Sequence, residues 1–157
     1  MAEFTIGAAG PEDMAAVRSL IEAYIEELGV DISYQGTEEE LADLPGPYAA
    51  PGGLILLAGR ESAADPVEVI AYRPLDEETC VMKRLFVSPE ARRFGIGEKL
   101  CLELMERARA QGYTVMKLDT LDHLKAAIKL YQRLGFRPCE PFTDSPIEHT
   151  HHFSIRL

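Results

Sequence analysis

Two hydrophobic periodicities alternate along this chain of 157 residues. Where apolar residues recur at intervals of three and four, they predict amphipathic helices, and where they alternate or run continuously over a shorter stretch, they predict strands. The helical pattern covers residues 11–28, a short stretch beginning at 37, 95–112 and 124–134. The strand pattern covers residues 4–8, 54–60, 67–73, 79–87, 114–119, 136–142 and 151–157.

Residues with strong terminal preferences mark the ends of the predicted helices. Pro11 stands at the start of the first helix, and a glycine follows the last apolar position of three of them. Thr37-Glu38-Glu39-Glu40 predicts a capping box, with Thr37 capping the short second helix. Leu44–Gly53 contains three prolines and three glycines, which predicts a loop.

The order of these elements predicts a mixed sheet with helices on its faces. Consecutive strands joined by short turns pair antiparallel, whereas the strand–helix–strand unit over residues 79–119 requires one parallel, right-handed crossover. We therefore expect an α/β (α+β) fold with a mostly antiparallel sheet of about seven strands and about four helices. The length predicts a single domain over residues 1–157.

Composition and charge narrow the possible partners. The chain is 46% hydrophobic and 27% charged, as in ordinary globular proteins, and it shows neither a membrane-length apolar run nor a secretory signal pattern. We therefore expect a cytoplasmic protein without a membrane partner. Its net charge of −10 is unevenly divided, with the acids concentrated in residues 1–82 and a basic excess in residues 83–157. The second half suits an anionic ligand, although acidic helix faces that only maintain solubility would leave the same pattern.

Several residue types argue against other kinds of site. The chain has no tryptophan and no basic stripe interleaved with aromatic residues, so we expect no nucleic-acid partner. Cys80, Cys101 and Cys139 form no CxxC pair and are predicted to be buried free thiols. The histidines at 149, 151 and 152 alternate along a predicted strand and cannot all face one ion, so they are predicted to be surface residues and not a metal site.

The junction between the strand at 79–87 and the helix at 95–112 holds the candidate chemistry. Gly95 and Gly97 at the helix start let the backbone turn sharply and approach a ligand, and the first N–H groups of a helix have no partner within it. Arg92 and Arg93 add positive charge at the positive end of the helix dipole. This arrangement predicts a phosphate site, while a tight turn with solvated arginines stays open on these residues alone.

Two segments resemble the signatures of the GNAT family of N-acetyltransferases. Arg92-x-x-Gly95-x-Gly97 resembles the first, Q/R-x-x-G-x-G/A, and Ala127-Ile128-Lys129-Leu130-Tyr131-Gln132-Arg133-Leu134-Gly135-Phe136 resembles the second, A-x-x-L-Y-x-x-x-G-F. The order of the predicted elements is also similar to that fold. The resemblance implies an enzyme that transfers an acetyl group from acetyl-CoA, its cosubstrate, to a primary amine of a small molecule or of a protein or peptide. The amine attacks directly, with no covalent enzyme intermediate and no metal.

The resemblance also implies roles for individual residues. Tyr131 would donate a hydrogen bond or proton to the leaving thiolate, although a tyrosine simply packed on the sheet is the alternative. The residues implied to bind acetyl-CoA belong to the fourth strand, to the first signature and to the start of the fourth helix: Leu85, Phe86, Val87, Arg92, Arg93, Phe94, Gly95, Ile96, Gly97, Glu98, Lys125 and Ala127. For Lys125, a solvated helix lysine is the alternative.

The acceptor amine would lie between the segment after the first helix and the final hairpin. The residues expected there are Tyr34, Gln35, Lys83, Arg84 and Phe142. Two cations in the cleft would favour an acceptor that carries a carboxylate beside its amine, and either cation could equally pair with a nearby acid. The chain would act as a monomer or homodimer.

Two positions depart from the family pattern. Val81 stands where many members have a glutamate that serves as general base, and Leu124-Lys125 stands where many have an asparagine. Another base would then be sought first among Glu140, Asp144 and the histidines of the final hairpin. The missing glutamate keeps an alternative open, a catalytically weak acyl-CoA-binding sensor or regulatory module of the same fold.

Overall fold

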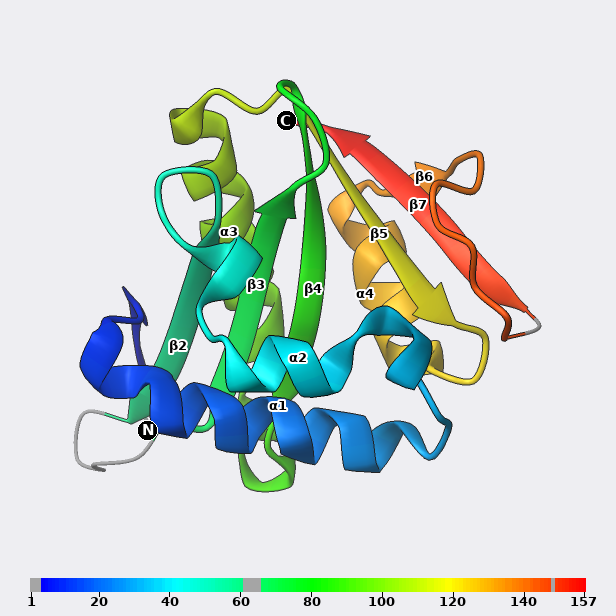
Figure 1. Ribbon diagram of the computed structural model, residues 1–157. Coiled ribbons are helices and arrows are strands. Elements are labelled where there is room, and N and C mark those ends of the chain that lie inside the picture. The colour runs from blue at the N-terminus through cyan, green and yellow to red at the C-terminus, as the bar shows by residue number, and fades with distance from the viewer. Residues whose placement is uncertain (1–3, 61–65, 148) are drawn as a thin grey trace.

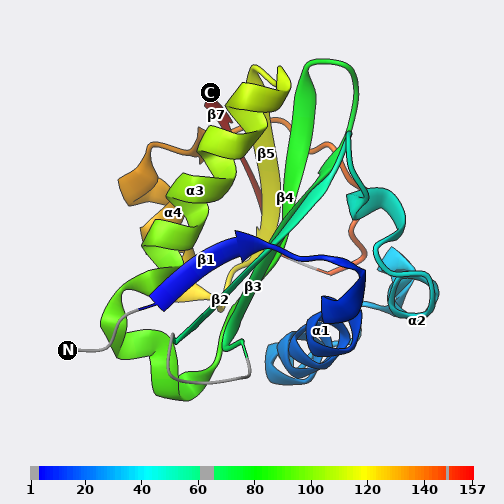
Figure 2. The same ribbon diagram turned by 90° about the vertical axis from the view of Figure 1, so that its left-hand side faces the viewer.

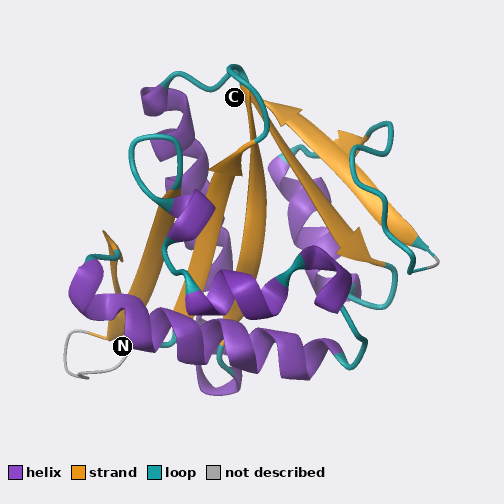
Figure 3. Ribbon diagram, viewed as in Figure 1, coloured by secondary structure: helices purple, strands orange, loops and turns teal. Residues whose placement is uncertain are grey.

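The computed structural model describes residues 4–60, 66–147 and 149–157 and consists of one sheet with helices on both faces (Figure 1). Its strands are β1 (Phe4–Ala8), β2 (Leu54–Arg60), β3 (Glu68–Pro74), β4 (Thr79–Val87), β5 (Val115–Leu121), β6 (Arg137–Pro138) and β7 (Thr150–Arg156). Its α-helices are α1 (Met14–Leu28), α2 (Thr37–Ala42), α3 (Ile96–Gln111) and α4 (Lys125–Leu134). Short 3-10 helices are η1 (Pro11–Asp13), η2 (Ser33–Gln35), η3 (Gly46–Tyr48) and η4 (Pro89–Phe94), and Figure 3 shows how these elements alternate with loops.

The sheet has the strand order β1-β2-β3-β4-β5-β7-β6. All neighbouring strands pair antiparallel except β4 and β5, which are parallel and connected through α3. Helices α1 and α2 cover one face, and α3 and α4 cover the other (Figure 2). The predicted fold class, a mixed and mostly antiparallel sheet of seven strands flanked by four helices, is confirmed for the described residues.

Alternating residues of the central strands build two apolar layers. In β3, Val69 packs with Val17 and Ile21 of α1, whereas Ile70 packs in a second cluster with Leu100 of α3. All five side chains are buried. Because both faces of β3 are covered, its apolar residues run continuously along the strand instead of alternating with polar ones.

Two irregularities of β4 shape the centre of the molecule. Its parallel pairing with β5 ends at Val81↔Lys117, and beyond this point the two strands diverge (Figure 1). In its pairing with β3, Phe86 lies opposite Val69 and Lys83 lies opposite Ala71, so β4 carries one extra residue there. Such a bulge bends a strand and changes the direction of its side chains.

Three local predictions are wrong in detail. Gly36 occupies the N-cap of α2 without a side-chain cap, and Thr37 is a buried residue of the first turn, so the predicted capping box does not form. The strand expected over residues 136–142 is reduced to Arg137–Pro138, because Pro138 and Pro141 have no N–H to donate to a ladder. Residues 89–94 form the helical turn η4 between β4 and α3, where the sequence pattern indicated no element.

The cysteines and histidines largely follow expectation. Cys80 and Cys101 are buried free thiols, and burial raises the pKa of Cys101 to about 12, whereas Cys139 is only half-buried. His149 is exposed, and the two following histidines are partly exposed. Within the described ranges, no three His, Cys, Asp or Glu residues lie close enough to hold a metal ion. None of the described helices has both the length and the hydropathy needed to cross a bilayer.

Candidate active site

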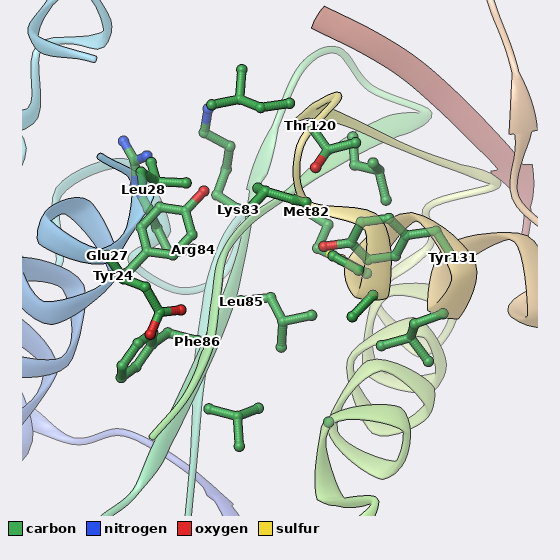
Figure 4. A pocket seen from close by; sticks show the side chains of 18 of the residues that line it. Tyr24, Glu27, Leu28, Met82, Lys83, Arg84, Leu85, Phe86, Thr120 and Tyr131 are labelled. Atoms are coloured by element: carbon green, nitrogen blue, oxygen red, sulfur yellow. The ribbon is translucent and has the colours of Figure 1, made fainter. Parts of the chain in front are cut away.

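A cavity of about 620 Å³ lies where β4 and β5 diverge (Figure 4). Its walls come from α1, η2, the second half of β4, the start of α3, the end of β5 and the first turns of α4. Beyond Val81, β4 has no hydrogen-bonded neighbour strand on its β5 side in the described structure. The backbone N–H and C=O groups of that edge are therefore available to pair with an extended ligand, as at other open sheet edges.

One end of the cavity contains most of the residues expected to bind a cofactor. Leu85, Phe86, Val87, Arg92, Gly95, Gly97, Glu98, Lys125 and Ala127 all line it. Phe94 and Ile96 do not: the Phe94 ring packs against Phe4 with centroids 5.5 Å apart, and Ile96 is buried in the core. The side chain of Arg93 lies outside the described residues.

Two glycines bring the α3 backbone to the cavity. Gly95 has φ +67°, a left-handed conformation that L side chains rarely adopt, and it turns the chain from η4 into α3. A Cβ on Gly97 would lie 3.4 Å from Val87 Cγ2, so a larger side chain there would fill the space beside β4. Because the first N–H groups of α3 have no partner within the helix, the cavity wall presents an anion-binding helix terminus.

Arginines border this end and are held in place by acids. Arg92 Nε donates to the Val87 carbonyl at 2.9 Å, and its guanidinium forms an ion pair with Glu27 of α1. Arg133 Nε lies 3.0 Å from Glu98 Oε1. Exposed pairs of this kind contribute little to stability, so the arginines can leave their acid partners and bind a polyanionic ligand at low cost.

Tyr131 of α4 reaches the centre of the cavity. Its ring packs in the core against Phe136, with centroids 5.9 Å apart, and the residue is only 7% exposed. In Figure 4 the hydroxyl points toward β4, on the side of Met82 and Leu85. It makes no hydrogen bond to any other described residue. Burial raises the pKa of Tyr131 well above its ordinary value, so the group stays a proton donor at physiological pH.

Arg84 is bound within the protein, although it was expected to face the acceptor. Its Nε donates to Glu40 Oε2 at 2.9 Å and its Nη2 to Glu40 Oε1 at 3.0 Å. Nη1 donates to Gln35 Oε1 at 2.9 Å, and the Tyr48 hydroxyl donates to Glu40 Oε1 at 3.0 Å. With its charge neutralised and its donors in use, Arg84 is unsuited to bind a second carboxylate.

Lys83 lies beside Arg84 and has a different set of contacts. Its Nζ donates to Gln35 Oε1 at 3.3 Å and lies 3.9 Å from Oδ1 of Asp119 on β5. Lys83 and Asp119 both line the cavity. Burial lowers the pKa of Lys83, and the Asp119 carboxylate opposes this shift.

At the other end of the cavity, two segments that are far apart in the sequence meet at the outer wall. The Tyr34 hydroxyl of η2 is hydrogen-bonded to the Ser145 hydroxyl at 3.0 Å. Tyr34 and Gln35 line the cavity as expected. Phe142 does not: its ring packs edge-on against His152, with centroids 5.1 Å apart. The structure therefore brings four of the five expected acceptor residues together.

Comparison with known proteins agrees with this geometry. The model of the acetyltransferase (GNAT) family matches residues 21–136, which include most of the cavity wall. The chain belongs to this family. An uncharacterized N-acetyltransferase of Schizosaccharomyces pombe is 33% identical over 148 residues, covering 94% of this chain and 90% of the relative. The prediction of a GNAT N-acetyltransferase is confirmed.

Solved GNAT structures share the whole fold. A GNAT acetyltransferase of Staphylococcus aureus superposes with a TM-score of 0.83 at 21% identity and covers 99% of both chains. A GNAT acetyltransferase of Elizabethkingia anophelis, solved with acetyl-CoA bound, superposes with a TM-score of 0.65 at 20% identity and covers 98% of both chains. This chain thus shares its fold with a structure that holds acetyl-CoA.

Several residues of this GNAT cavity were missed by sequence reasoning. Asp119, Tyr24 and Glu27 line it, and Glu40 lies behind Arg84. For Asp119 the sequence held no clear signal, since it alternates with apolar residues in the same way as Lys117 of the same strand. The other three belong to acidic helix faces, where nothing in the sequence separates them from solvated neighbours.

The glutamate position of other family members provides no base here. Val81 is 6% exposed and is not part of the cavity wall. Glu140, Asp144 and the three histidines of the final hairpin, where a substitute base was expected, do not line the cavity either. Asp119 is the carboxylate that lies at the divergence of β4 and β5.

Proposed function

We propose that this protein transfers the acetyl group of acetyl-CoA to a primary amine of a small molecule or of a protein or peptide. The observation that carries the proposal is the Tyr131 hydroxyl, free of partners among the described residues, beside an unpaired edge of β4 and a helix terminus suited to phosphate. The three features suit in turn the thiol, the extended arm and the pyrophosphate of one ligand. Their arrangement along one cavity supports an acyl-CoA substrate.

The chain's own groups suggest how each part is held. The first N–H groups of α3 and the Arg92 guanidinium would bind the pyrophosphate, and the open edge of β4 from Leu85 to Val87 would pair with the pantetheine arm. This places the thioester near Tyr131. The side chains of Leu85 and Val87 provide an apolar wall that excludes water from the thioester.

The proposed reaction is a direct attack. The nitrogen lone pair of the amine forms a bond to the thioester carbonyl carbon, and the electron pair of the C–S bond passes to sulfur when that bond breaks. Tyr131 donates its proton to the departing thiolate. The proton that the nitrogen loses then reprotonates Tyr131. A backbone N–H of the open β4 edge would stabilise the developing oxyanion. The products are an N-acetyl amine and CoA with a free thiol.

A reducing environment suits this protein. Cys80 and Cys101 are free thiols buried in the core, and proteins of oxidising compartments more often use such residues in disulfides. This supports the proposed cytoplasmic location.

Thiol release tests the proposal directly. The protein is incubated with acetyl-CoA and a panel of amines, amino acids and peptides, free thiol is followed in time, and the acetylated product is identified by mass spectrometry. We expect thiol release that depends on the amine and matches the N-acetyl product in amount. Acetyl-CoA binding without thiol release for any acceptor would instead indicate an acyl-CoA-binding sensor or regulatory module.

A further inference from the structure

Two partly buried charges, Lys83 and Asp119, have hydrogen-bonding capacity that no other described residue uses. The Asp119 side chain is 10% exposed and makes no hydrogen bond to another described residue. Its nearest cation, Lys83 Nζ, is 3.9 Å away, well beyond the ~2.7–2.9 Å of a charge-assisted hydrogen bond. The Lys83 side chain is 15% exposed and uses one of its three donors, at 3.3 Å to Gln35. Buried charges are normally fully hydrogen-bonded, so this pair is incomplete without a ligand.

The neighbouring groups leave Lys83 as the cation that faces a ligand here. Arg84 is neutralised by Glu40 through two hydrogen bonds and directs a third donor to Gln35. Gln35 Oε1 accepts from both cations and so holds Lys83 at the cavity wall. The acceptor end therefore presents one negative and one positive group side by side.

Apolar side chains also line this end, beside the polar side chains of Tyr24, Gln35 and Thr120. Leu28, Ile32 and Leu121 line the wall around the charged pair and are buried. The hydrogen bond between Tyr34 and Ser145 joins η2 to the segment before β7 and closes the outer side. This enclosure suits a compact acceptor with an apolar side chain and disfavours a polypeptide that must continue out of the site.

We propose that the acceptor is a free α-amino acid with an apolar side chain, bound through its ammonium to Asp119 and through its carboxylate to Lys83. The inference rests on the proposed function and names its substrate class. An ammonium and a carboxylate attached to the same carbon complement an anion and a cation 3.9 Å apart, because each charge then lies beside two of opposite sign. The bound zwitterion completes the hydrogen bonds that both side chains lack.

Asp119 then acts as a catalytic residue. Its carboxylate accepts one proton from the bound ammonium, and the freed lone pair forms the N–C bond as the C–S bond breaks. The nitrogen loses a second proton when the tetrahedral intermediate collapses, and the CoA thiolate takes one from Tyr131. Of the two protons that nitrogen loses, one ends on the CoA thiol and one passes through Asp119 to solvent, so the step balances.

The first test uses the wild-type protein and compares matched acceptors. Leucine, phenylalanine and methionine are each assayed beside the amide of the same amino acid and beside the amine that lacks the carboxyl group. We expect kcat/KM for the amino acid to exceed that for the other two by about 10²-fold or more, since they leave the buried Lys83 charge unpaired. Equal rates for all three forms, or faster acetylation of peptide N-termini, would overturn this proposal alone.

Variants of Lys83 test whether the preference for an acceptor with a carboxylate depends on the charge of this side chain. Lys83→Met should raise KM for leucine until kcat/KM for leucine is no higher than that for leucinamide measured with the same variant. Lys83→Arg should retain most of the preference because it keeps the charge. Lys129→Met is the control, since Lys129 is exposed and outside the cavity wall. If Lys83→Met slowed acid and amide equally, Lys83 would have no part in carboxylate binding.

Asp119→Asn tests the proton transfer. We expect kcat/KM to fall by about 10²-fold at pH 7 and the loss to shrink as pH rises, because more of the amine is then already deprotonated. The titratable groups that face Asp119 are Lys83 of β4, Tyr24 of α1 and Tyr131 of α4, and His152 of β7 lies directly opposite Asp119 in the β5–β7 pairing. Asp144→Asn, at an exposed position, is the control. A loss that stays constant with pH would remove Asp119 from proton transfer.

The outcomes separate this proposal from the proposed function. If acetyl-CoA binds and no acceptor of any class releases thiol, the transferase function fails and this inference fails with it. If amines are acetylated without regard to their carboxylate, the transferase stands and only the amino acid assignment fails. The comparison of acceptors on wild-type protein decides between them even if a variant does not fold.

Discussion

Arg84 and Glu40 form a two-pronged ion pair that ties the bulge of β4 to helix α2, with N–O distances of 2.9 and 3.0 Å. Arg84 has φ +64°, a left-handed conformation that a non-glycine residue adopts only when its surroundings compensate the strain. Both side chains are almost wholly buried. The pair therefore holds in place the strand distortion that turns Lys83 toward the acceptor end.

Glu40→Gln should strongly destabilise the fold. The change leaves the buried Arg84 guanidinium without its counter-charge, and breaking one side of a buried pair costs about 3–5 kcal/mol. Chemical denaturation followed by circular dichroism measures the free energy of unfolding. Glu39→Gln, one residue earlier and exposed, serves as the matched control and should change stability little. Equal stability of the two variants would show that the pair contributes nothing net.

Gly97→Glu should abolish acetyl-CoA binding while the fold is kept. Its carboxylate would lie at the first turn of α3, where it would occupy the anion site and repel the phosphates. Gly97→Ala is the control, because its Cβ would make only an ordinary contact with Val87 Cγ2, at 3.4 Å. Isothermal titration with acetyl-CoA compares the affinities, and circular dichroism checks the fold. Wild-type affinity in Gly97→Glu would contradict the assignment of the phosphate site.

Tyr131→Phe should lower kcat by about 10²- to 10⁴-fold with little change in the KM for acetyl-CoA. The lost hydroxyl interacts most strongly when charge develops on sulfur, so its removal affects the transition state more than the ground state. Tyr113→Phe is the control, since the Tyr113 hydroxyl donates to the Gly52 carbonyl at 2.7 Å, away from the cavity. Full turnover in Tyr131→Phe would show that Tyr131 only packs in the core and does not act as a proton donor.

The residues predicted for the phosphate site line one cavity in the structure, and this grouping could be predicted because they are close together in the sequence. Gly95, Gly97 and Arg92 act through one turn and the first amides of one helix, and that local geometry follows from the sequence alone. Tyr131 was found in the same way, from a signature confined to a single helix. The strands and helices themselves were predicted from periodicity. The errors are the length of β6, where prolines end the strand pairing, and the start of α2, where Gly36 is the N-cap residue.

The end of the cavity at Lys83 and Asp119 depends on contacts between elements that are far apart in the sequence. No local sequence pattern encodes such contacts. Asp119 meets Lys83 only because β4 and β5 are adjacent in the sheet and diverge after three residue pairs. Arg84 looked like a cation available to a ligand until the fold placed Glu40, 44 residues earlier, against it. Charge alone therefore identified the two cations but could not show which one a ligand meets.

Glu68 provides a last test, because it is an acid with no partner in the core. The residue is fully buried in β3, between Ala58 of β2 and Val87 of β4, and neither carboxylate oxygen has a hydrogen-bond partner. Burial raises the pKa of Glu68 from its ordinary value of 4.5 to about 8. The folded protein thus holds this carboxyl protonated at neutral pH, whereas the unfolded chain ionises it.

Glu68→Gln should therefore remove a pH-dependent loss of stability. Since the folded pKa lies above the unfolded one, folding takes up a proton between about pH 4.5 and pH 8, and wild-type stability falls as pH rises through that window. The variant is neutral at every pH, so it should be more stable than wild type by about 4 kcal/mol near pH 8 and by little at pH 4.5. Urea denaturation at both pH values measures this difference, with Glu90→Gln, an exposed position, as control. The same gap between variant and wild type at both pH values would mean that Glu68 ionises in the folded state as readily as in the unfolded chain.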